Sequence, residues 1–128
     1  MAAVLVVDDD PDGCEAVMRA LRKSGKAVRT APNGREALAA LIDAATPDVV
    51  VLDVRMPEMD GLQFLEVIRS YLRWSHLPVV LLTAFADPAV LERVEELGVK
   101  HVFVKANYQM SELLACVDEL STKPRADA

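Results

Sequence analysis

Short continuous apolar runs recur along the chain, separated by longer segments in which apolar residues stand three and four positions apart. Continuous runs of this length are typical of parallel strands buried on both faces of a sheet. Residues 26–31 mix polar and apolar side chains, so they are predicted to form an edge strand. The predicted buried strands are residues 3–7, 49–52 and 79–82, with a shorter one at 102–104.

A helical periodicity follows each predicted strand. The fourth helix is also marked at its ends, by Asp87 as N-cap, Pro88 in the first turn and Gly98 just past the last turn. The apolar positions that define the other helices are Cys14, Val17, Met18 and Leu21; Leu38, Leu41, Ile42 and Ala45; Leu65, Ile68 and Leu72; and Leu113, Cys116, Val117 and Leu120.

Five consecutive strand–helix units predict an α/β fold, a single doubly wound five-stranded parallel sheet with helices on both faces. With residues 26–31 at one edge, the flavodoxin-like strand order 2-1-3-4-5 is expected. In such sheets a ligand binds at the carboxyl ends of the strands where the strand order reverses, here between the first and third strands. Residues 1–121 are predicted to form one domain, and residues 122–128 a polar tail or the start of a linker.

Polar residues follow four of the predicted strands at their carboxyl ends. Strand ends are often polar because loops begin there, but that accounts for one or two such residues and not for several carboxylates facing one crevice. Grouped carboxylates repel each other unless a cation compensates them, and a cluster of hard oxygen ligands suits Mg²⁺. The residues are Asp8, Asp9 and Asp10 after the first strand, Asp53 after the third, Thr83 after the fourth and Lys105 after the fifth.

These groups together favour the chemistry of a phosphoryl group. Lys105 can pair with a phosphoryl oxygen, Thr83 can donate a hydrogen bond to another, and a carboxylate can act as the nucleophile that forms an acyl phosphate. No His or Cys is predicted at these strand ends. The sequence also lacks a GxxxxGK[ST] loop, so ATP is not the expected donor.

The composition of the chain limits the kinds of partner expected for it. The chain has 128 residues and a formal net charge of -6, which argues against a nucleic-acid surface. It has no apolar stretch of membrane-spanning length and no basic signal-peptide region, so a cytoplasmic domain without membrane contact is expected. The two cysteines, Cys14 and Cys116, have no metal-like spacing and are expected to be small buried apolar residues.

Four pieces of the sequence, taken with their spacing, resemble the receiver domain of two-component response regulators from about residue 3 to residue 120. They are Val-Val-Asp8-Asp9-Asp10, Leu-Asp53-Val-Arg-Met56-Pro57-Glu-Met-Asp60-Gly61, Leu-Leu-Thr83-Ala84 and Val-Lys105.

The resemblance implies that Asp53 is the phosphoacceptor. It also implies that Asp8, Asp9, Asp53 and the backbone carbonyl of Arg55 hold Mg²⁺, and that Thr83, Ala84 and Lys105 bind the phosphoryl group and switch with it. Asp10 is then a solvated loop residue. The implied partners are a sensor histidine kinase or a histidine phosphotransfer protein as donor, and a downstream protein or a fused effector domain. A weak homodimer is compatible with the resemblance, and no direct binding of nucleic acid is implied.

The chain departs from the family pattern near the site. Receivers usually have proline after the lysine of the last strand and an aromatic residue three positions before it, where this chain has Ala106 and Val102. A trans Lys105–Ala106 bond is expected, because a cis bond before a non-proline residue costs about 3 kcal/mol. Arg55 and Phe85 are larger than many residues found at their positions, and both are expected to flank the path of an attacking water.

Two other readings remain open. A binding-only receiver that is never phosphorylated, and acts as a docking or dimerisation module, is compatible with the departures near Lys105. A haloacid-dehalogenase-type phosphatase would use Asp8 as nucleophile and Asp10 as acid. Its motif requires Thr or Val where Asp12 stands, and its fold usually needs a longer chain.

Overall fold

The computed structural model describes residues 1–85 and 87–122, in which five strands and five α-helices alternate along the chain. The strands are β1 (Ala3–Val7), β2 (Ala27–Ala31), β3 (Val49–Leu52), β4 (Val79–Thr83) and β5 (His101–Val104). The helices are α1 (Pro11–Lys23), α2 (Gly34–Asp43), α3 (Gly61–Arg69), α4 (Pro88–Glu96) and α5 (Met110–Thr122), with a short 3-10 helix at Leu72–Trp74.

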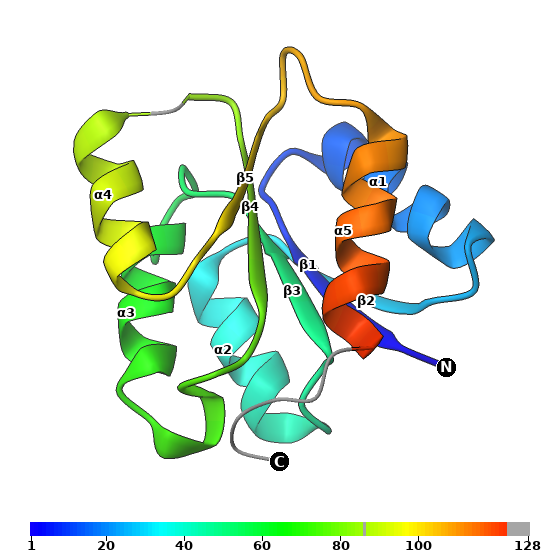
Figure 1. Ribbon diagram of the computed structural model, residues 1–128. Helices are drawn as coiled ribbons and strands as arrows, with labels where there is room; N and C mark the ends of the chain where they lie inside the picture. Colours follow the sequence, from blue (N-terminus) through cyan, green and yellow to red (C-terminus); the bar gives the residue numbers. More distant parts are fainter. Residues whose placement is uncertain (86, 123–128) are drawn as a thin grey trace.

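The five strands form one parallel sheet in the order β2-β1-β3-β4-β5 (Figure 1). This order confirms the prediction, including the edge position of β2, in which Val28 and Ala31 are buried and the other three residues are exposed. Chain order reverses between β1 and β3, so the carboxyl ends of these two strands lie side by side. The switch point of the fold is therefore where Asp8 and Asp53 leave the sheet.

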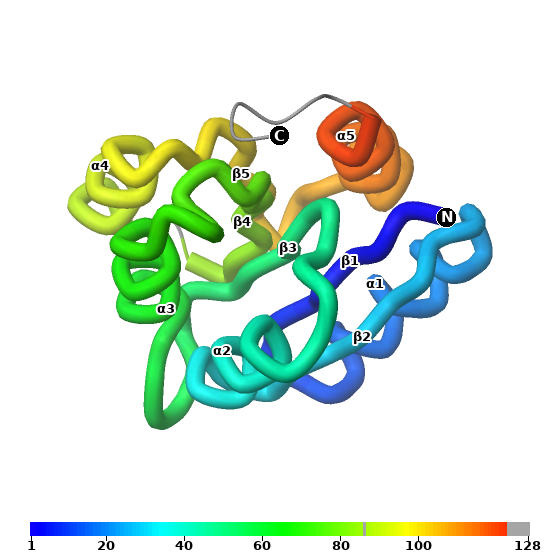
Figure 2. The backbone as a smooth tube through the Cα atoms, turned by 90° about the horizontal axis from the view of Figure 1, so that it is seen from below, coloured from blue at the N-terminus to red at the C-terminus, as the bar shows by residue number. Residues whose placement is uncertain are grey.

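Helices cover both faces of the sheet, with α1 and α5 on one side and α2, α3 and α4 on the other (Figures 1 and 2). Side chains of β1 alternate between the two layers: Val4 and Val6 pack on the α1–α5 side, and Leu5 and Val7 on the opposite side. Because both faces of the central strands are covered, every position in β1, β3 and β4 is apolar except Thr83, the last residue of β4. This is the physical origin of the continuous apolar runs.

Two of the predicted helices end earlier than expected. Helix α3 stops at Arg69, and Leu72, predicted on its apolar stripe, is 85% exposed in the 3-10 helix. Trp74 occupies the buried position instead, and its indole N–H donates to the hydroxyl of Thr46 at 3.4 Å. The reason is local: the chain turns after Arg69 to bring the larger apolar side chain inward, which buries more surface than Leu72 would.

Helix α2 likewise ends at Asp43, so Ala45 lies beyond it. Ile42 lies in the last turn of α2 and is exposed rather than buried. A nearby proline, Pro47, favours extended backbone in the residue before it, which limits how far the helix can continue.

At the other end of the chain, α5 continues through Thr122, one residue past the predicted domain boundary at 121, and residues 123–128 of the predicted tail lie outside the described residues. The longest helices, α1 and α5, have 13 residues each. Within residues 1–85 and 87–122, no helix combines the length and the apolar character needed to cross a bilayer.

Candidate functional site

The backbone at the carboxyl edge of the sheet holds the candidate residues in fixed positions. The amide of Asp53 donates to the carbonyl of Val7 at 2.9 Å, and the amide of Lys105 donates to the carbonyl of Thr83 at 2.8 Å. Hydrogen bonding between the strands thus continues one residue past β3 and β5. Because this ladder is part of the sheet, the positions of these residues follow from the core packing rather than from a mobile loop.

Lys105 joins two buried carboxylates. Its ammonium nitrogen lies 2.8 Å from Oδ2 of Asp8 and 3.1 Å from Oδ2 of Asp53. Asp8 is 6% exposed and Asp53 is 5% exposed, whereas the Lys105 side chain is partly open to solvent. One positive charge therefore faces two buried negative charges, and the pair of carboxylates carries a surplus of negative charge.

One oxygen of Asp53 has no partner. Its Oδ1 is buried and is the one buried side-chain oxygen or nitrogen without a hydrogen bond among residues 1–85 and 87–122. Carboxylate oxygens of Asp8, Asp9 and Asp53 lie within 4.8 Å of one another, and Asp9 is exposed at the mouth of the group. A buried unpaired oxygen beside two further carboxylates is the donor set that a hard divalent cation such as Mg²⁺ requires. The residues present fit that ion.

Burial raises the pKa of Asp53 above its usual value. The hydrogen bond from Lys105 and its charge act in the opposite direction, and the charge of Asp8 adds to the rise. For Lys105, burial works against the charged form, but the hydrogen bonds to Asp8 and Asp53 outweigh it and raise the pKa. Ionised Asp53 is thus disfavoured by its surroundings unless further positive charge arrives.

Thr83, the last residue of β4, is 1% exposed, and its hydroxyl takes part in a tight turn. The Thr83 hydroxyl oxygen lies 3.3 Å from the carbonyl oxygen of Phe85. The same hydroxyl oxygen accepts the amide of Phe85 at 3.4 Å. Ala84, between them, is exposed at the same edge. The Phe85 ring in turn lies 4.9 Å from the guanidinium carbon of Arg55. Arg55 and Phe85 therefore form a cation–π contact, and their predicted place beside the path of an attacking water stays a prediction.

The segment after Asp53 turns sharply into α3. The amide of Gly61 donates to the carbonyl of Val54 at 2.8 Å, and a Cβ added at Gly61 would lie 2.1 Å from the carbonyl oxygen of Asp53. Any larger residue would push the backbone of Asp53 away, so glycine is required by this close approach. Asp60 caps the helix in a reciprocal pair with Gln63.

Two residues that shape this segment were not predicted from the sequence. Asn33 is 7% exposed; its Oδ1 accepts the amide of Glu36 at the start of α2, and its Nδ2 donates to a carboxylate oxygen of Glu58 at 3.1 Å. Glu58 has a φ of 62°, in the left-handed region. The signal available in the sequence, an Asn-Gly-x-Glu start before an apolar run, marks a helix N-terminus but not its contact with residue 58.

Asp10 and the residues around Lys105 lie at the border of the site. Asp10 is exposed, precedes the first turn of α1 and lies outside the carboxylate cluster, while its amide donates to Oδ1 of Asp8 at 3.0 Å. The Lys105–Ala106 bond is trans, as expected, because no cis bond occurs among the described residues. Val102 is exposed on the α4 side, and Phe103 packs on the α1–α5 side against Tyr108.

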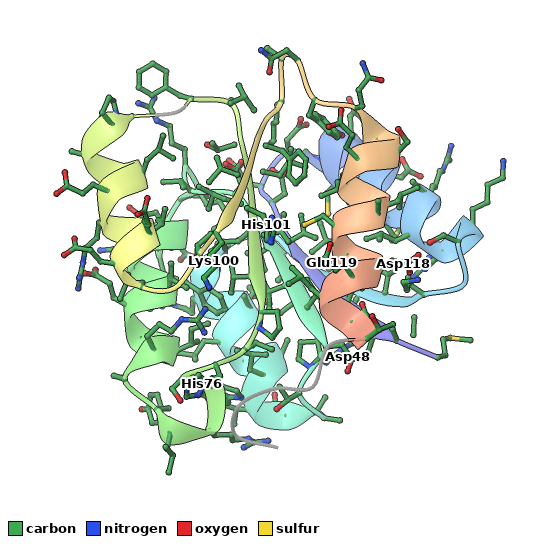
Figure 3. The ribbon with its side chains drawn as sticks, viewed as in Figure 1. Asp48, His76, Lys100, His101, Asp118 and Glu119 are labelled. Carbon is green, nitrogen blue, oxygen red and sulfur yellow. The ribbon has the colours of Figure 1, made fainter. Side chains whose placement is uncertain are left out.

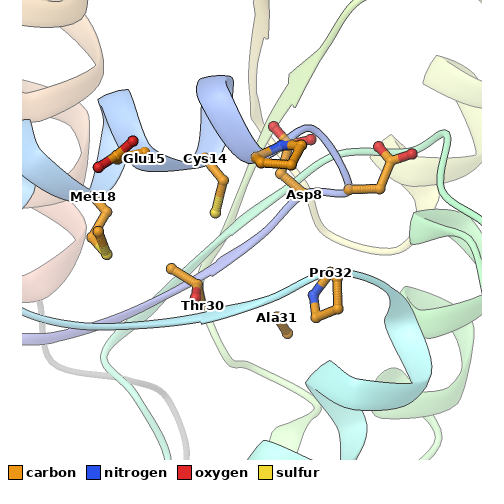
Figure 4. Close-up of a pocket in the computed structure, with 9 residues that line it drawn as sticks. Asp8, Cys14, Glu15, Met18, Thr30, Ala31 and Pro32 are labelled. Carbon is orange, nitrogen blue, oxygen red and sulfur yellow. The ribbon is translucent and has the colours of Figure 1, made fainter.

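Cysteine and histidine take no part in the cluster. Cys14 is buried beside a cavity of about 350 Å³ between α1 and β2 (Figure 4), and burial raises the pKa of its thiol. Cys116 was expected to be buried, but it is only partly buried. His76 precedes β4 and His101 begins β5, so both lie toward the amino ends of the strands, away from the carboxylates (Figure 3). Oxygen ligands and one ammonium group therefore define the chemistry of the site.

Comparison with known proteins agrees with this geometry. The chain matches the model of the response regulator receiver domain over residues 4–118. It is 39% identical over 125 residues to Response regulator MprA of Mycolicibacterium vanbaalenii, an alignment covering 97% of this chain and 52% of that protein. This chain therefore spans about half the length of that curated relative.

Solved structures show the same fold. The chemotaxis response regulator CheY4 of Vibrio cholerae superimposes with a TM-score of 0.83 at 32% identity, over 94% of this chain and 98% of that one. A putative response regulator from Chloroflexus aurantiacus gives a TM-score of 0.86 at 30% identity, over 95% and 98%. The fold and the site define a signalling domain of two-component systems rather than a conventional enzyme. The chain belongs to the response regulator receiver domain family.

Asp9 and Asp10 form a matched pair for testing the cation site. Both are exposed neighbours, but only Asp9 belongs to the carboxylate cluster. We expect Asp9→Asn to weaken Mg²⁺ binding by roughly tenfold or more, because a charged oxygen ligand is lost. Asp10→Asn removes the same charge and should leave the affinity near that of the parent. Isothermal titration calorimetry at fixed ionic strength measures both; equal losses in the two variants would place the cation elsewhere.

Proposed function

We propose that this chain is a phosphoacceptor receiver domain that takes a phosphoryl group from a phosphohistidine onto Asp53, with Mg²⁺, and thereby changes its interaction with a partner. The observation that carries the proposal is the buried, unpaired Oδ1 of Asp53 at the switch point of the sheet. A buried carboxylate with a free oxygen is costly to keep unless it serves chemistry.

The residues around Asp53 support a distinct role for each. Asp8, Asp9 and the Arg55 carbonyl would hold Mg²⁺ together with Asp53 itself, and the bound ion would neutralise charge on the phosphoryl oxygens. Lys105, already within hydrogen-bond distance of Asp53, would move its contact to a phosphoryl oxygen. Thr83 would exchange its contacts with Phe85 for a second oxygen, with the exposed Ala84 beside it.

The transfer itself requires no further catalytic group. A carboxylate oxygen of Asp53 forms a bond to phosphorus while the bond from phosphorus to the donor's imidazole nitrogen breaks, and that nitrogen keeps the electron pair. In a second step, hydrolysis regenerates Asp53: water attacks phosphorus, the bond to Asp53 breaks, and the products are the carboxylate, phosphate and a proton. Among residues 1–85 and 87–122, neither histidine lies at this end of the sheet to act as a general base, so we expect hydrolysis to be slow.

The family also supplies the partners of the proposal. The donor would be a sensor histidine kinase or a histidine phosphotransfer protein in the cytoplasm, and the readout a downstream protein or an effector domain joined to this one. The relative MprA is about twice as long as the aligned region, which supports a fused effector as one form of output. A weak homodimer is compatible with the proposal; direct nucleic-acid or membrane binding by this domain is not part of it.

Incubation with acetyl phosphate and Mg²⁺, followed by intact-mass measurement, tests the proposal. We expect the parent to gain one labile phosphoryl group, which chelation of Mg²⁺ prevents. Asp53→Asn should gain none, whereas Asp10→Asn should be modified like the parent.

Two results would contradict the proposal, and each points to one of the other readings. A parent that binds Mg²⁺ but gains no phosphoryl group would be a docking module. A phosphoryl group that persists in Asp53→Asn would favour Asp8 as nucleophile, as in the phosphatase reading.

The contact between Arg55 and Phe85 gives a prediction for the lifetime of the phosphorylated form. We expect the pair to shield the path of the attacking water, so that Arg55→Ala with Phe85→Ala speeds loss of the phosphoryl group. An exposed cation–π contact contributes about 0.5–1 kcal/mol, which corresponds to roughly twofold to fivefold faster decay. Arg73→Ala is the matched control, since Arg73 stacks on Trp74 at the other end of α3. Decay at the parental rate in the double variant would exclude shielding.

A further inference from the structure

The segment from residue 54 to residue 60 is tied to the start of α2 at two places. The amide of Gly34 donates to the carbonyl of Met59 at 2.8 Å, and Nδ2 of Asn33 donates to Oε2 of Glu58 at 3.1 Å. A Cβ at Gly34 would lie 2.7 Å from the Met59 carbonyl, so the two segments touch without room for a side chain. This segment also carries Arg55, whose carbonyl is one of the proposed ligands of the cation.

The orientation of the Asn33 amide is fixed from both sides. Its oxygen accepts the amide of Glu36 at 2.8 Å, which leaves the nitrogen to face Glu58. Asn33 is buried, whereas Glu58 is exposed, and its backbone has a left-handed conformation that residues with a side chain rarely adopt. Such a conformation persists where its surroundings hold it, and the bond from Asn33 is one of the contacts that do so.

We propose that Asn33 is a positioning residue for phosphoryl transfer: by holding Glu58, it sets the path of residues 54–60 and thereby the Arg55 carbonyl that completes the cation site. This inference rests on the proposed function. Substituting a group that orients a metal ligand without touching the metal typically lowers metal affinity or activity by roughly tenfold to hundredfold. Asn33 touches neither cation nor phosphoryl group and acts only through this segment.

The side chain of Asn33 makes two contacts: its oxygen caps α2 and its nitrogen donates to Glu58. One substitution separates these two contacts. Asn33→Asp keeps an oxygen to cap α2, because Asp and Asn are equally good N-caps. It replaces the amide donor by a second carboxylate oxygen, which repels Glu58. In Asn33→Asp with Glu58→Gln, the new amide at position 58 can donate back, and the net charge returns to that of the parent. Glu58→Gln alone keeps an acceptor for Asn33.

An effect of charge alone and a positioning role of Asn33 predict opposite changes in Mg²⁺ affinity for these variants. An added negative charge near the carboxylate cluster attracts Mg²⁺, so Asn33→Asp would strengthen binding and Glu58→Gln would weaken it if charge alone mattered. If Asn33 positions the segment, Asn33→Asp weakens binding despite its charge, Glu58→Gln stays near the parent, and the double variant recovers.

The test is Mg²⁺ affinity by isothermal titration calorimetry, with the rate of modification by acetyl phosphate, in the parent and the three variants. We expect Asn33→Asp to bind Mg²⁺ about tenfold more weakly and to be modified more slowly, with recovery in the double variant. Urea unfolding without Mg²⁺ measures stability separately, and a residue with only a structural role would change that midpoint while leaving the affinity of the folded protein unaltered.

Failure of the inference is distinguishable from failure of the proposed function. If the parent binds Mg²⁺ and is phosphorylated on Asp53 while Asn33→Asp does so equally well, the positioning role is wrong and the proposed function stands. An affinity that follows charge, with Asn33→Asp binding more tightly, overturns the positioning role as well. If the parent shows neither binding nor modification, the proposed function itself fails.

Discussion

Lys105 donates hydrogen bonds to Asp8 and Asp53, and these bonds hold together two carboxylates that would otherwise repel each other in a buried crevice. One ammonium group cannot balance two buried negative charges, so the crevice retains a demand for positive charge, most clearly at the unpaired Oδ1 of Asp53. The raised pKa of Asp53, caused first by its burial, expresses the same imbalance. A divalent cation would supply positive charge there and a phosphoryl group would add negative charge, so we expect the crevice to respond to both.

The parallel sheet determines which residues share this crevice. Strands β1 and β3 are neighbours because the chain order reverses between them, so Asp8 and Asp53 meet although 45 positions separate them. Lys105 reaches them from the end of the edge strand β5, and its amide is fixed by Thr83. The core on each face keeps the strand ends in register. Packing across the whole domain therefore keeps the two carboxylates close together despite their repulsion.

Much of the fold and of the cluster follows from local patterns in the sequence. Strands buried on both faces produce continuous apolar runs, and parallel strands present their carboxyl ends at one edge, so the meeting of Asp8, Asp53 and Lys105 was predictable. Choices settled by tertiary packing were not. Leu72 fits the helical period, but Trp74 takes the buried place. The bond from Asn33 to Glu58 joins segments 25 positions apart that no local pattern connects.

We expect Lys105 and a divalent cation to compensate the same buried charge. The most direct test is the free energy of unfolding of the parent and of Lys105→Met, measured in chelator and in saturating Mg²⁺. Losing Lys105 leaves the carboxylates unpaired, so the variant should be less stable in chelator by roughly 2 kcal/mol. Mg²⁺ should then stabilise Lys105→Met more than the parent and narrow the gap. Equal stabilisation of both proteins by Mg²⁺ would contradict the account.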